Sequence, residues 1–342
     1  MHAVTIPRYG PPSVLQVREY PDPTPGPGQL RIAVAASGLN FAEVTARQGL
    51  YPDAPKPPCV VGYEVSGTVD ALGAGVTGVE IGTRVLALTP FGGHASSVVV
   101  DARYAFPMPD SMTFAQGAAI PVNYLTAHHI LFWIGNLHPG DRVLLHMAAG
   151  GVGTAVLQLV QTVPDITVFG TASPSKHDYL RGLGCQHPID YRSQDYAAEV
   201  RRLTDGEGVD MVLDALGGAD WKTGWKLLRP AGRMIAFGFA NTIGGSSRNL
   251  LRLVGQLISV PRFSPLGAMD NNRGMHGVNM GHLWDQIDLL RPQIERIVEL
   301  FEAGVVVPQI HAEVPFSEAA RAHSMLEDRQ NRGKVVLVPD AG

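Results

Sequence analysis

Hydrophobic and polar positions follow two different patterns along this chain of 342 residues. Up to about residue 118, short β-rich runs alternate with Gly and Pro, and the runs that we expect to form strands are 30–36, 65–71, 84–88 and 95–100. Regular short strands without helical periodicity are typical of a barrel. The pattern therefore predicts a barrel-like β domain at the start of the chain.

The second pattern begins near Arg142 and alternates apolar strands with amphipathic helices. The expected strands are 143–146, 166–170, 209–213 and 234–238, and the expected crossover helices include 153–163 and 176–183. Such alternation requires parallel strands with right-handed crossovers. We therefore predict a doubly wound Rossmann domain, and an α/β fold class for the whole chain.

The remaining segments complete a plan of two domains, as the chain length favours. A helix is expected at 285–303, and 333–339 is expected to be a last strand that returns to the first domain. Segment 250–273 is poorly patterned. The predicted barrel domain comprises 1–118 and 266–342, and the predicted dinucleotide-binding domain comprises 119–265.

Composition and charge exclude several classes of protein. Apolar residues make up 45% of the chain and charged residues 17%, which suits a compact fold. The net charge of -4 leaves no general basic face for a nucleic acid. The sequence has neither a secretory signal nor a run of about 18 apolar residues. We therefore expect a cytoplasmic protein without a membrane span.

The strongest local signal runs from Val143 to Gly153, VLLHMAAGGVG, where a strand leads into a glycine-rich turn and then into an apolar helix. This arrangement is typical of a dinucleotide site. Gly150 lets the backbone approach a pyrophosphate, and Gly153 lets the helix pack close to the strand. The free N–H groups of the first helical turn would face the phosphates. Ala148 replaces the usual first glycine, so the prediction depends on the surrounding strand and helix.

The end of the second strand favours one of the two nicotinamide dinucleotides. An NAD site offers Asp or Glu to the ribose 2′-hydroxyl about 20 residues after the glycine turn. Here the segment is GTASPSK, 170–176, in which hydroxyls and Lys176 stand in place of an acid. A 2′-phosphate requires such donors and positive charge, so NADPH is the predicted cofactor. The alternative for Lys176 is a solvated lysine on the first turn of a helix.

Several segments together resemble a known family. They are SGLNF at 37–41, GLYP at 49–52, VGYE at 61–64, AAGGVG at 148–153 and VLDALG at 212–217. Their order and spacing are similar to those of the quinone oxidoreductase and zeta-crystallin branch of the medium-chain dehydrogenases/reductases. The resemblance implies a GroES-like barrel beside the Rossmann sheet. Within the branch, TVPDITVFGTAS at 162–173 and the following Lys176-His177 are most similar to VAT-1 homologues.

The resemblance implies a site without zinc. In the metal-dependent alcohol dehydrogenases a cysteine occupies the position of Asn40 and a histidine that of Tyr63, and neither replacement is a good zinc ligand. The chain has only two cysteines, Cys59 and Cys185, which excludes a structural zinc site of four thiolates. We therefore expect no metal, and a buried hydrogen-bonding role for Glu64.

The resemblance also implies contacts with the cofactor, from the nicotinamide ribose at Asn40 and Thr126 to the adenosine phosphate at Thr171, Lys176 and Tyr191. The residues expected to contact NADPH are Asn40, Asn123, Thr126, Ala149, Gly150, Gly151, Val152, Gly153, Thr171, Ser173, Lys176, Tyr191, Leu216, Phe237, Gly238, Val278, Asn279 and Arg329.

A site without a Lewis acid fits a conjugated acceptor best. Hydride adds to the β-carbon of an enone or quinone, and the charge that spreads to the carbonyl oxygen needs only hydrogen-bond donors. The catalytic candidates are Asn40, Tyr51 and Tyr63, with water as a candidate proton source. The alternative for the two tyrosines is that they line an apolar pocket.

Three functions remain open at this point. The first is an NADPH-dependent reductase of quinones or enones. The second is a biosynthetic tailoring enzyme that uses the same fold for another transformation, and the third is a nucleotide-binding partner or lipid-transport protein of the VAT-1 type. Proteins of this family usually pair through edge strands of their nucleotide domains, so we expect a homodimer through an edge at 274–280.

Overall fold

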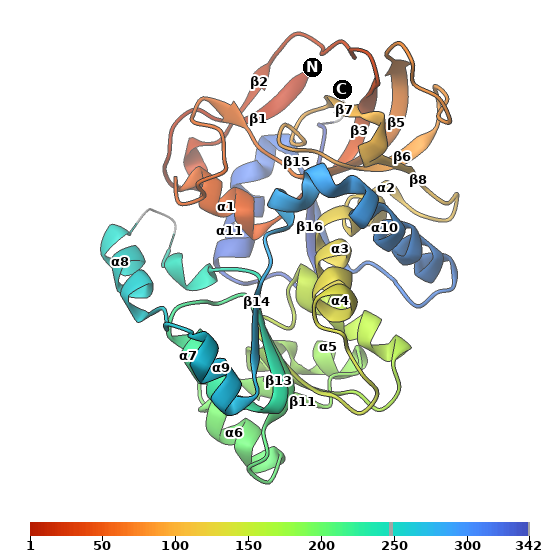
Figure 1. The fold of residues 1–342 in the computed structure, drawn as a ribbon. Helices are drawn as coiled ribbons and strands as arrows, with labels where there is room; N and C mark the ends of the chain where they lie inside the picture. Colours follow the sequence, from red (N-terminus) through yellow and green to blue (C-terminus); the bar gives the residue numbers. More distant parts are fainter. Residues whose placement is uncertain (246–248, 341–342) are drawn as a thin grey trace. The chain divides into compact units, whose positions relative to one another are not determined.

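The computed structural model describes residues 1–245 and 249–340, which form two compact units (Figure 1). The first unit holds residues 1–125, 245 and 281–340, and the second holds Thr126–Gly244 and Asn249–Met280. These two units are defined by the contacts within each of them. The domain boundaries at 118 and 265 stay a prediction.

The second unit is built on a parallel sheet with the strand order β11-β10-β9-β12-β13-β14. Counted along the chain, this is the order 3-2-1-4-5-6 of a Rossmann sheet. The strands are β9 (Arg142–Leu145), β10 (Thr167–Ala172), β11 (His187–Asp190), β12 (Val209–Asp214), β13 (Leu228–Ala236) and β14 (Gly274–Gly277). The predicted doubly wound fold is therefore confirmed.

Helices connect these strands and cover the sheet (Figure 1). They are α4 (Gly151–Leu159), α5 (His177–Gly182), α6 (Tyr196–Leu203) and α7 (Ala219–Leu227). Apolar side chains from strands and helices share one core, as Leu144, Val200 and Leu227 illustrate. Before β9, the chain runs through α2 (Phe114–Gly117) and α3 (Leu125–His128), with wide π turns at Ile120–Tyr124 and His129–Trp133.

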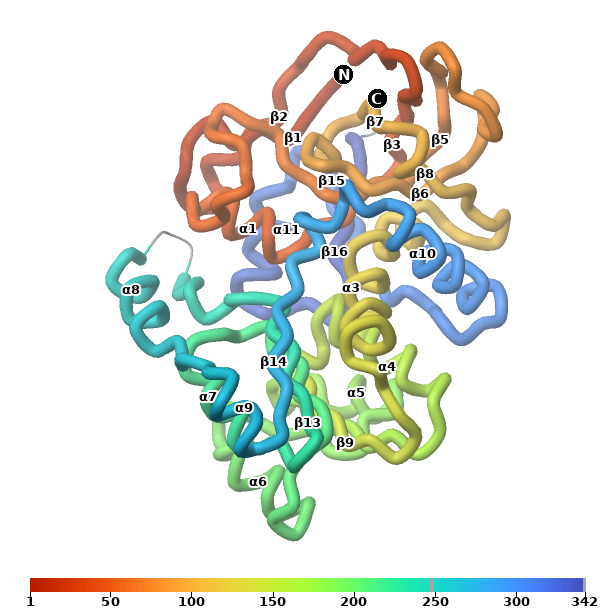
Figure 2. The backbone as a smooth tube through the Cα atoms, in the orientation of Figure 1, coloured from red at the N-terminus to blue at the C-terminus, as the bar shows by residue number. Residues whose placement is uncertain are grey.

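The segment that the sequence left without a pattern forms two further helices, α8 (Leu250–Ser259) and α9 (Pro265–Asn271), which lead into β14 (Figure 2). Each begins at a capping side chain: Asn249 accepts from the N–H of Arg252, and Ser264 accepts from that of Gly267. These caps were a sequence signal. The sequence analysis missed them, together with the helical spacing of the apolar residues Leu250, Val254 and Leu257. In the structure the apolar side chains of α8 are largely exposed, Leu251 to 88%.

The first unit contains the expected β structure. One sheet has the order β15-β16-β3-β5-β6-β8, with β7 also paired to β3, and a smaller sheet has the order β2-β1-β4. The strands are β1 (His2–Ile6), β2 (Gln16–Glu19), β3 (Gln29–Leu39), β4 (Cys59–Val60), β5 (Glu64–Leu72), β6 (Arg84–Leu88), β7 (Ser97–Asp101), β8 (Ala105–Pro107), β15 (Ile310–Pro315) and β16 (Lys334–Val338).

The last strand, β16, pairs antiparallel with β3, and Val336 lies opposite Gly38. The prediction that the chain end returns to the first unit is therefore confirmed. The helices of this unit are α1 (Phe41–Arg47), α10 (Ile287–Glu302) and α11 (Ala319–Glu327). Side chains of α1 and α11 pack on β16, among them Val44, Leu326 and Val335.

Candidate functional site

The parallel sheet brings most of the expected cofactor residues to one edge. All its strands point the same way, so the loops after them meet at their carboxyl ends, where such sheets bind ligands. Gly150 follows β9, Lys176 follows β10, and Tyr191 follows β11. Leu216 follows β12, and the other expected residues at this edge follow β13 and β14: Phe237, Gly238, Val278 and Asn279.

The glycine turn after β9 has the geometry of a phosphate site. Gly150 is the N-cap of α4, and no side chain caps this end of the helix. The first N–H groups of a helix carry partial positive charge and have no partner inside the helix. A Cβ on Gly153 would lie 2.4 Å from the backbone oxygen of Ala148, so only glycine lets the helix pack this close to the turn. A phosphate group therefore fits this turn.

The end of β10 and the loop after it carry several hydroxyl groups, some buried and some nearer the surface. Thr171 is buried, and its Oγ1 lies 3.1 Å from Nδ1 of His146, inside the unit. Ser173 follows the strand, and its hydroxyl lies 3.4 Å from that of Ser175. Lys176 ends a short 3-10 turn, Pro174–Lys176, and its side chain is largely buried rather than extended into solvent. A solvated surface lysine therefore does not describe it.

The loop after the third strand, β11, contains a residue that the sequence analysis overlooked, Arg192. The guanidinium of Arg192 lies over the ring of Tyr191, at 5.9 Å from its centroid. Asp190 accepts from the backbone N–H of Arg192 and from the hydroxyl of Ser193, and the Ser193 bond is the main cause of its lowered pKa. This adds a second cation, after Lys176, at the edge where the extra phosphate of NADPH is expected.

Three further expected residues do not follow a strand of the parallel sheet. Asn123 lies in the π turn Ile120–Tyr124 of the first unit, and Thr126 begins the second; both are buried. Arg329, in the first unit, follows α11 with a positive φ of 54°. Their contact with a cofactor stays a prediction.

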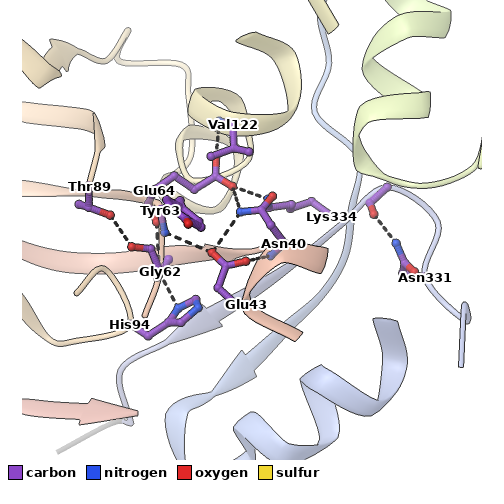
Figure 3. A network of polar contacts seen from close by, with 12 residues as sticks. Asn40, Glu43, Gly62, Tyr63, Glu64, Thr89, His94, Val122, Asn331 and Lys334 are labelled. Carbon is purple, nitrogen blue, oxygen red and sulfur yellow. Dashed lines mark hydrogen bonds and ion pairs between the residues drawn. The ribbon is translucent and has the colours of Figure 1, made fainter. Parts of the chain in front are cut away.

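The first unit contains a buried polar network around Asn40 (Figure 3). The Asn40 side chain accepts from Nζ of Lys334 at 2.6 Å and donates to Oε1 of Glu64 at 2.9 Å. Lys334 also pairs directly with Glu64, whose Oε2 accepts from the backbone N–H of Val122 at 2.7 Å. Glu64 is fully buried, which confirms its expected role as a buried hydrogen-bonding residue.

Glu43 completes this network. Its Oε2 accepts from the backbone N–H of Asn40 at 2.8 Å, and its Oε1 lies 3.4 Å from Nδ2 of Asn40 and accepts from the N–H of Tyr63 at 3.2 Å. Burial raises the pKa of Glu43 to about 7, against the opposing charge of Lys334. The charges of Lys334 and Glu64 compensate each other, so a second buried carboxyl is held near its protonated form.

These bonds engage both hydrogens and the oxygen of the Asn40 amide inside the first unit. The side chain is 8% exposed. Its geometry therefore suits a positioning role, in which the amide fixes the start of α1, better than donation to a substrate oxygen.

Tyr63 differs from Asn40 because it belongs to an aromatic cluster. Its ring lies 6.1 Å from that of Tyr51, nearly perpendicular to it, and 4.8 Å from that of Phe91. Burial raises the pKa of Tyr63, and a hydrogen bond with Tyr51 raises it further. The hydroxyl therefore keeps its proton at every physiological pH, as a hydrogen-bond donor must.

The sequence analysis missed Glu43 and Lys334. Glu43 stands three residues after Asn40, the spacing of a capping box, and that signal was readable. Lys334 precedes the apolar strand residues Val335 to Val338 and looks like an ordinary solvated lysine. His94 is fully buried, and burial lowers its pKa to about 3.

Metal ligands do not gather in the described part of the chain: residues 1–245 and 249–340 contain no group of three His, Cys, Asp or Glu side chains placed to hold an ion. Asn40 and Tyr63 stand at the positions compared above with the zinc ligands of alcohol dehydrogenases. The Asn40 amide donates to Glu64, and the Tyr63 ring packs against Tyr51.

Comparisons with known proteins agree with this fold. Residues 26–110 match the alcohol dehydrogenase GroES-like domain family, and residues 183–337 match the zinc-binding dehydrogenase family. The chain is 43% identical over 325 residues to the mouse (Mus musculus) synaptic vesicle membrane protein VAT-1 homolog, covering 95% of this chain and 80% of that protein. It is 32% identical over 335 residues to a quinone oxidoreductase of Pseudomonas aeruginosa, covering 97% of each.

Among solved structures, Escherichia coli quinone oxidoreductase complexed with NADPH superposes with a TM-score of 0.87 at 26% identity, covering 99% of this chain and all of that one. A Rossmann sheet, a GroES-like unit and a glycine turn for a dinucleotide define the class of protein, a medium-chain oxidoreductase. The chain belongs to the medium-chain dehydrogenase/reductase family, in the branch of the VAT-1 homologues and quinone oxidoreductases. The resemblance seen in the sequence is confirmed.

The VAT-1 homologues are named as vesicle membrane proteins. In the residues that the structure describes here, every helix is too short or too polar to cross a bilayer.

Proposed function

We propose that the chain is an NADPH-dependent reductase of conjugated carbonyl compounds, quinones or enones. One observation carries the proposal: the N-terminus of α4 has no side-chain cap and lies at the carboxyl end of β9 in the Rossmann sheet, packed through Gly153 against Ala148. The E. coli quinone oxidoreductase with the same fold is an NADPH complex, and the P. aeruginosa relative is also named a quinone oxidoreductase.

The residues present fit NADPH. The turn from Gly150 to Gly153 would hold the pyrophosphate, and Lys176 with Arg192 would hold the 2′-phosphate, since no acid follows β10 to bind a 2′-hydroxyl. When bound, NADPH would supply a hydride, which together with one proton from water saturates the double bond of an enone or converts a quinone to its hydroquinone, and leaves NADP⁺.

The chain's own residues would bind and orient the acceptor. Tyr63 keeps its proton and offers a hydroxyl to the carbonyl oxygen, where negative charge develops. Tyr51 shares a hydrogen bond with Tyr63 and holds that hydroxyl in place. Asn40 acts through the network, by fixing the start of α1, the helix that precedes the loop with Tyr51.

The test of this function is NADPH oxidation, followed at 340 nm, with a panel of quinones and enones and with identification of the reduced product. Turnover of at least one conjugated acceptor, and none of simple ketones, supports the proposal. Tight NADPH binding without turnover across the panel would contradict it and would favour a tailoring or binding role.

The cofactor preference has its own test. Replacement Lys176→Gln should weaken NADPH binding about tenfold, because a charged partner of the 2′-phosphate is lost, while NADH binding stays unchanged. Calorimetry measures both. Lys222→Gln on the exposed face of α7 is the matched control and should change neither. An equal loss of affinity for both dinucleotides would mean that Lys176 supports the fold and does not bind the 2′-phosphate.

We also infer a homodimer. β14 is the edge strand of the parallel sheet and pairs with β13 on one side. An open edge strand is a template for pairing with another chain. Sedimentation should give a dimer at micromolar concentration, and a monomer alone would contradict the inference.

A further inference from the structure

A cavity of about 440 Å³ lies within the first unit, beside the aromatic cluster of Tyr63. Its walls come from the loops around β5 and β6 and from the 3-10 turn Met280–Gln286. It is large enough for a small organic ligand. The lining residues are Asp53, Tyr63, Pro90, Phe91, Tyr104, Gly281, His282, Trp284 and Asp285.

Aromatic rings form a fixed part of this lining. The Tyr63 ring lies 5.2 Å from that of Trp284 at 87° and 4.8 Å from that of Phe91 at 45°. The Tyr104 hydroxyl donates to the backbone oxygen of Trp284 at 3.2 Å. Both Tyr63 and Trp284 are buried. Rings held by neighbours in this way can contact a ligand without a large entropic cost.

The charged side chains of the lining are mostly negative. Asp53 and Asp285 supply two carboxylates, and the described lining has no lysine or arginine. His282 is the basic group of the lining, and its Nε2 lies 2.9 Å from Oδ2 of Asp53. The nearest arginines bind elsewhere: Arg103 pairs with Asp101, and Arg291 pairs with Glu295 and lies over the ring of Phe106.

The carboxylates near the cavity affect the pKa values of its two tyrosine hydroxyls. Burial raises the pKa of Tyr104, and the carboxylate of Asp285 raises it further. The pKa of Tyr63 is raised by burial, by Tyr51, and then by the charges of Glu43 and Asp53. The carboxylates of Asp285 and Asp53 therefore act on the two phenols, and the charge of Arg103 opposes that of Asp285 at Tyr104.

We propose that this cavity binds the ammonium group of an organic cation, and, resting on the proposed function, that the conjugated carbonyl substrate carries such a group. Aromatic faces attract a cation whose centre lies within about 6 Å, and carboxylates at the rim add charge attraction. Tyr63 joins the two parts, because it lines the cavity and is a candidate donor to the substrate carbonyl. A neutral quinone would contact the rings but would gain nothing from the negative charge of Asp53 and Asp285.

The first experiment compares choline with its neutral isostere 3,3-dimethylbutan-1-ol, by calorimetry on the full chain and by quenching of its tryptophan fluorescence. The two probes share their shape and differ in charge. Choline should bind about tenfold more tightly. Equal affinities, or binding of neither probe, would overturn the proposal.

Variants locate the site of binding. Asp53→Asn combined with Asp285→Asn should remove most of the preference for choline and leave the neutral alcohol unaffected, because only the charge attraction is lost. Both carboxylates are exposed, so the fold should tolerate the change. Asp178→Asn, at a 99% exposed carboxylate of the second unit, is the matched control and should bind like the parent. A preference that survives the double change would overturn the assignment to this cavity.

The second experiment measures kcat/KM with NADPH for two benzalacetones, one with a para trimethylammonio group and one with a para tert-butyl group. Their ratio should favour the cation and should fall about tenfold in the Asp53→Asn, Asp285→Asn double variant, which cancels differences in intrinsic reactivity. Turnover of both without this fall overturns the substrate inference and leaves the proposed function intact. Choline binding without any turnover overturns the proposed function and supports the cation site.

Discussion

Two buried polar clusters, one in each unit, differ in how fully their charged groups are compensated. In the first unit, Lys334 and Glu64 pair directly, and Asn40 and Glu43 satisfy the atoms around them. In the second unit, His146 and Asp214 are buried equally well, but His146 Nε2 and Asp214 Oδ2 stand 4.0 Å apart. Neither of these two atoms has a hydrogen-bond partner among the described residues.

The difference shows what each cluster depends on. A paired buried charge is strongly destabilising once one partner is removed. A carboxylate that already lacks full compensation has less to lose, and burial raises the pKa of Asp214 accordingly. We therefore expect the first cluster to respond to mutation far more than the second.

The largest effect should come from Lys334→Met. The change leaves Glu64 buried without its cation and should lower the free energy of unfolding by about 3–5 kcal/mol in urea titrations. Adding Glu64→Gln should recover part of this loss. Lys226→Met, at an exposed position of α7, is the control. A loss below about 1 kcal/mol would show that the network contributes little and would remove the contrast between the clusters.

The next effect is a pH dependence that Glu43 causes. Its pKa is about 7 in the folded chain and near 4.5 when unfolded. The folded state therefore binds more protons, and the stabilisation is complete below pH 4.5 and lost as the pH rises through 7. The shift corresponds to about 3 kcal/mol. Glu43→Gln should flatten this slope relative to the parent, whereas Glu19→Gln on the exposed β2 should not. Parallel slopes in all three proteins would contradict the assignment.

A smaller effect is expected at the second cluster. Thr171→Val removes the hydroxyl that lies 3.1 Å from Nδ1 of His146 and should cost about 1 kcal/mol. Thr171→Ser keeps the hydroxyl and should restore most of the loss. If serine behaves like valine, the hydrogen bond is not the cause.

The smallest effect should follow Asp214→Asn. The remaining oxygen still accepts from the backbone N–H groups of Leu216 and Gly217, and the new amide can donate towards His146. The free energy of unfolding should change by less than about 1 kcal/mol. A loss as large as that of Lys334→Met would mean that the His146–Asp214 pair is an intact ion pair, and the comparison would fail.

Much of the fold was predictable because its signals are local. The turn from Val143 to Gly153 joins a strand to a helix within a few residues, and the expected strands of both units overlap those observed. The caps of α8 and α9 and the helical spacing of the apolar residues in α8 were equally local signals, but the sequence analysis missed them. The predicted ends of helices and strands differ most from the observed ends where tertiary contacts, and not periodicity, end the element.

The candidate site was predictable only in part. The glycine turn and Lys176 were recognised from residue type and spacing, whereas Arg192 was not, because its position over Tyr191 depends on how the loop after β11 folds. Asn40 was identified as a site residue, but its engagement by Lys334 came from a residue 294 positions away.

The sequence by itself determined the class of each unit, the dinucleotide turn and the absence of an acid after the second strand, since these follow from the order of neighbouring residues. The tertiary structure decided which charges are buried together. Lys334 meets Glu64 because β3 pairs with both β5 and β16. Residues 270 positions apart are thereby enclosed in one network, and burial then sets the protonation of Glu43.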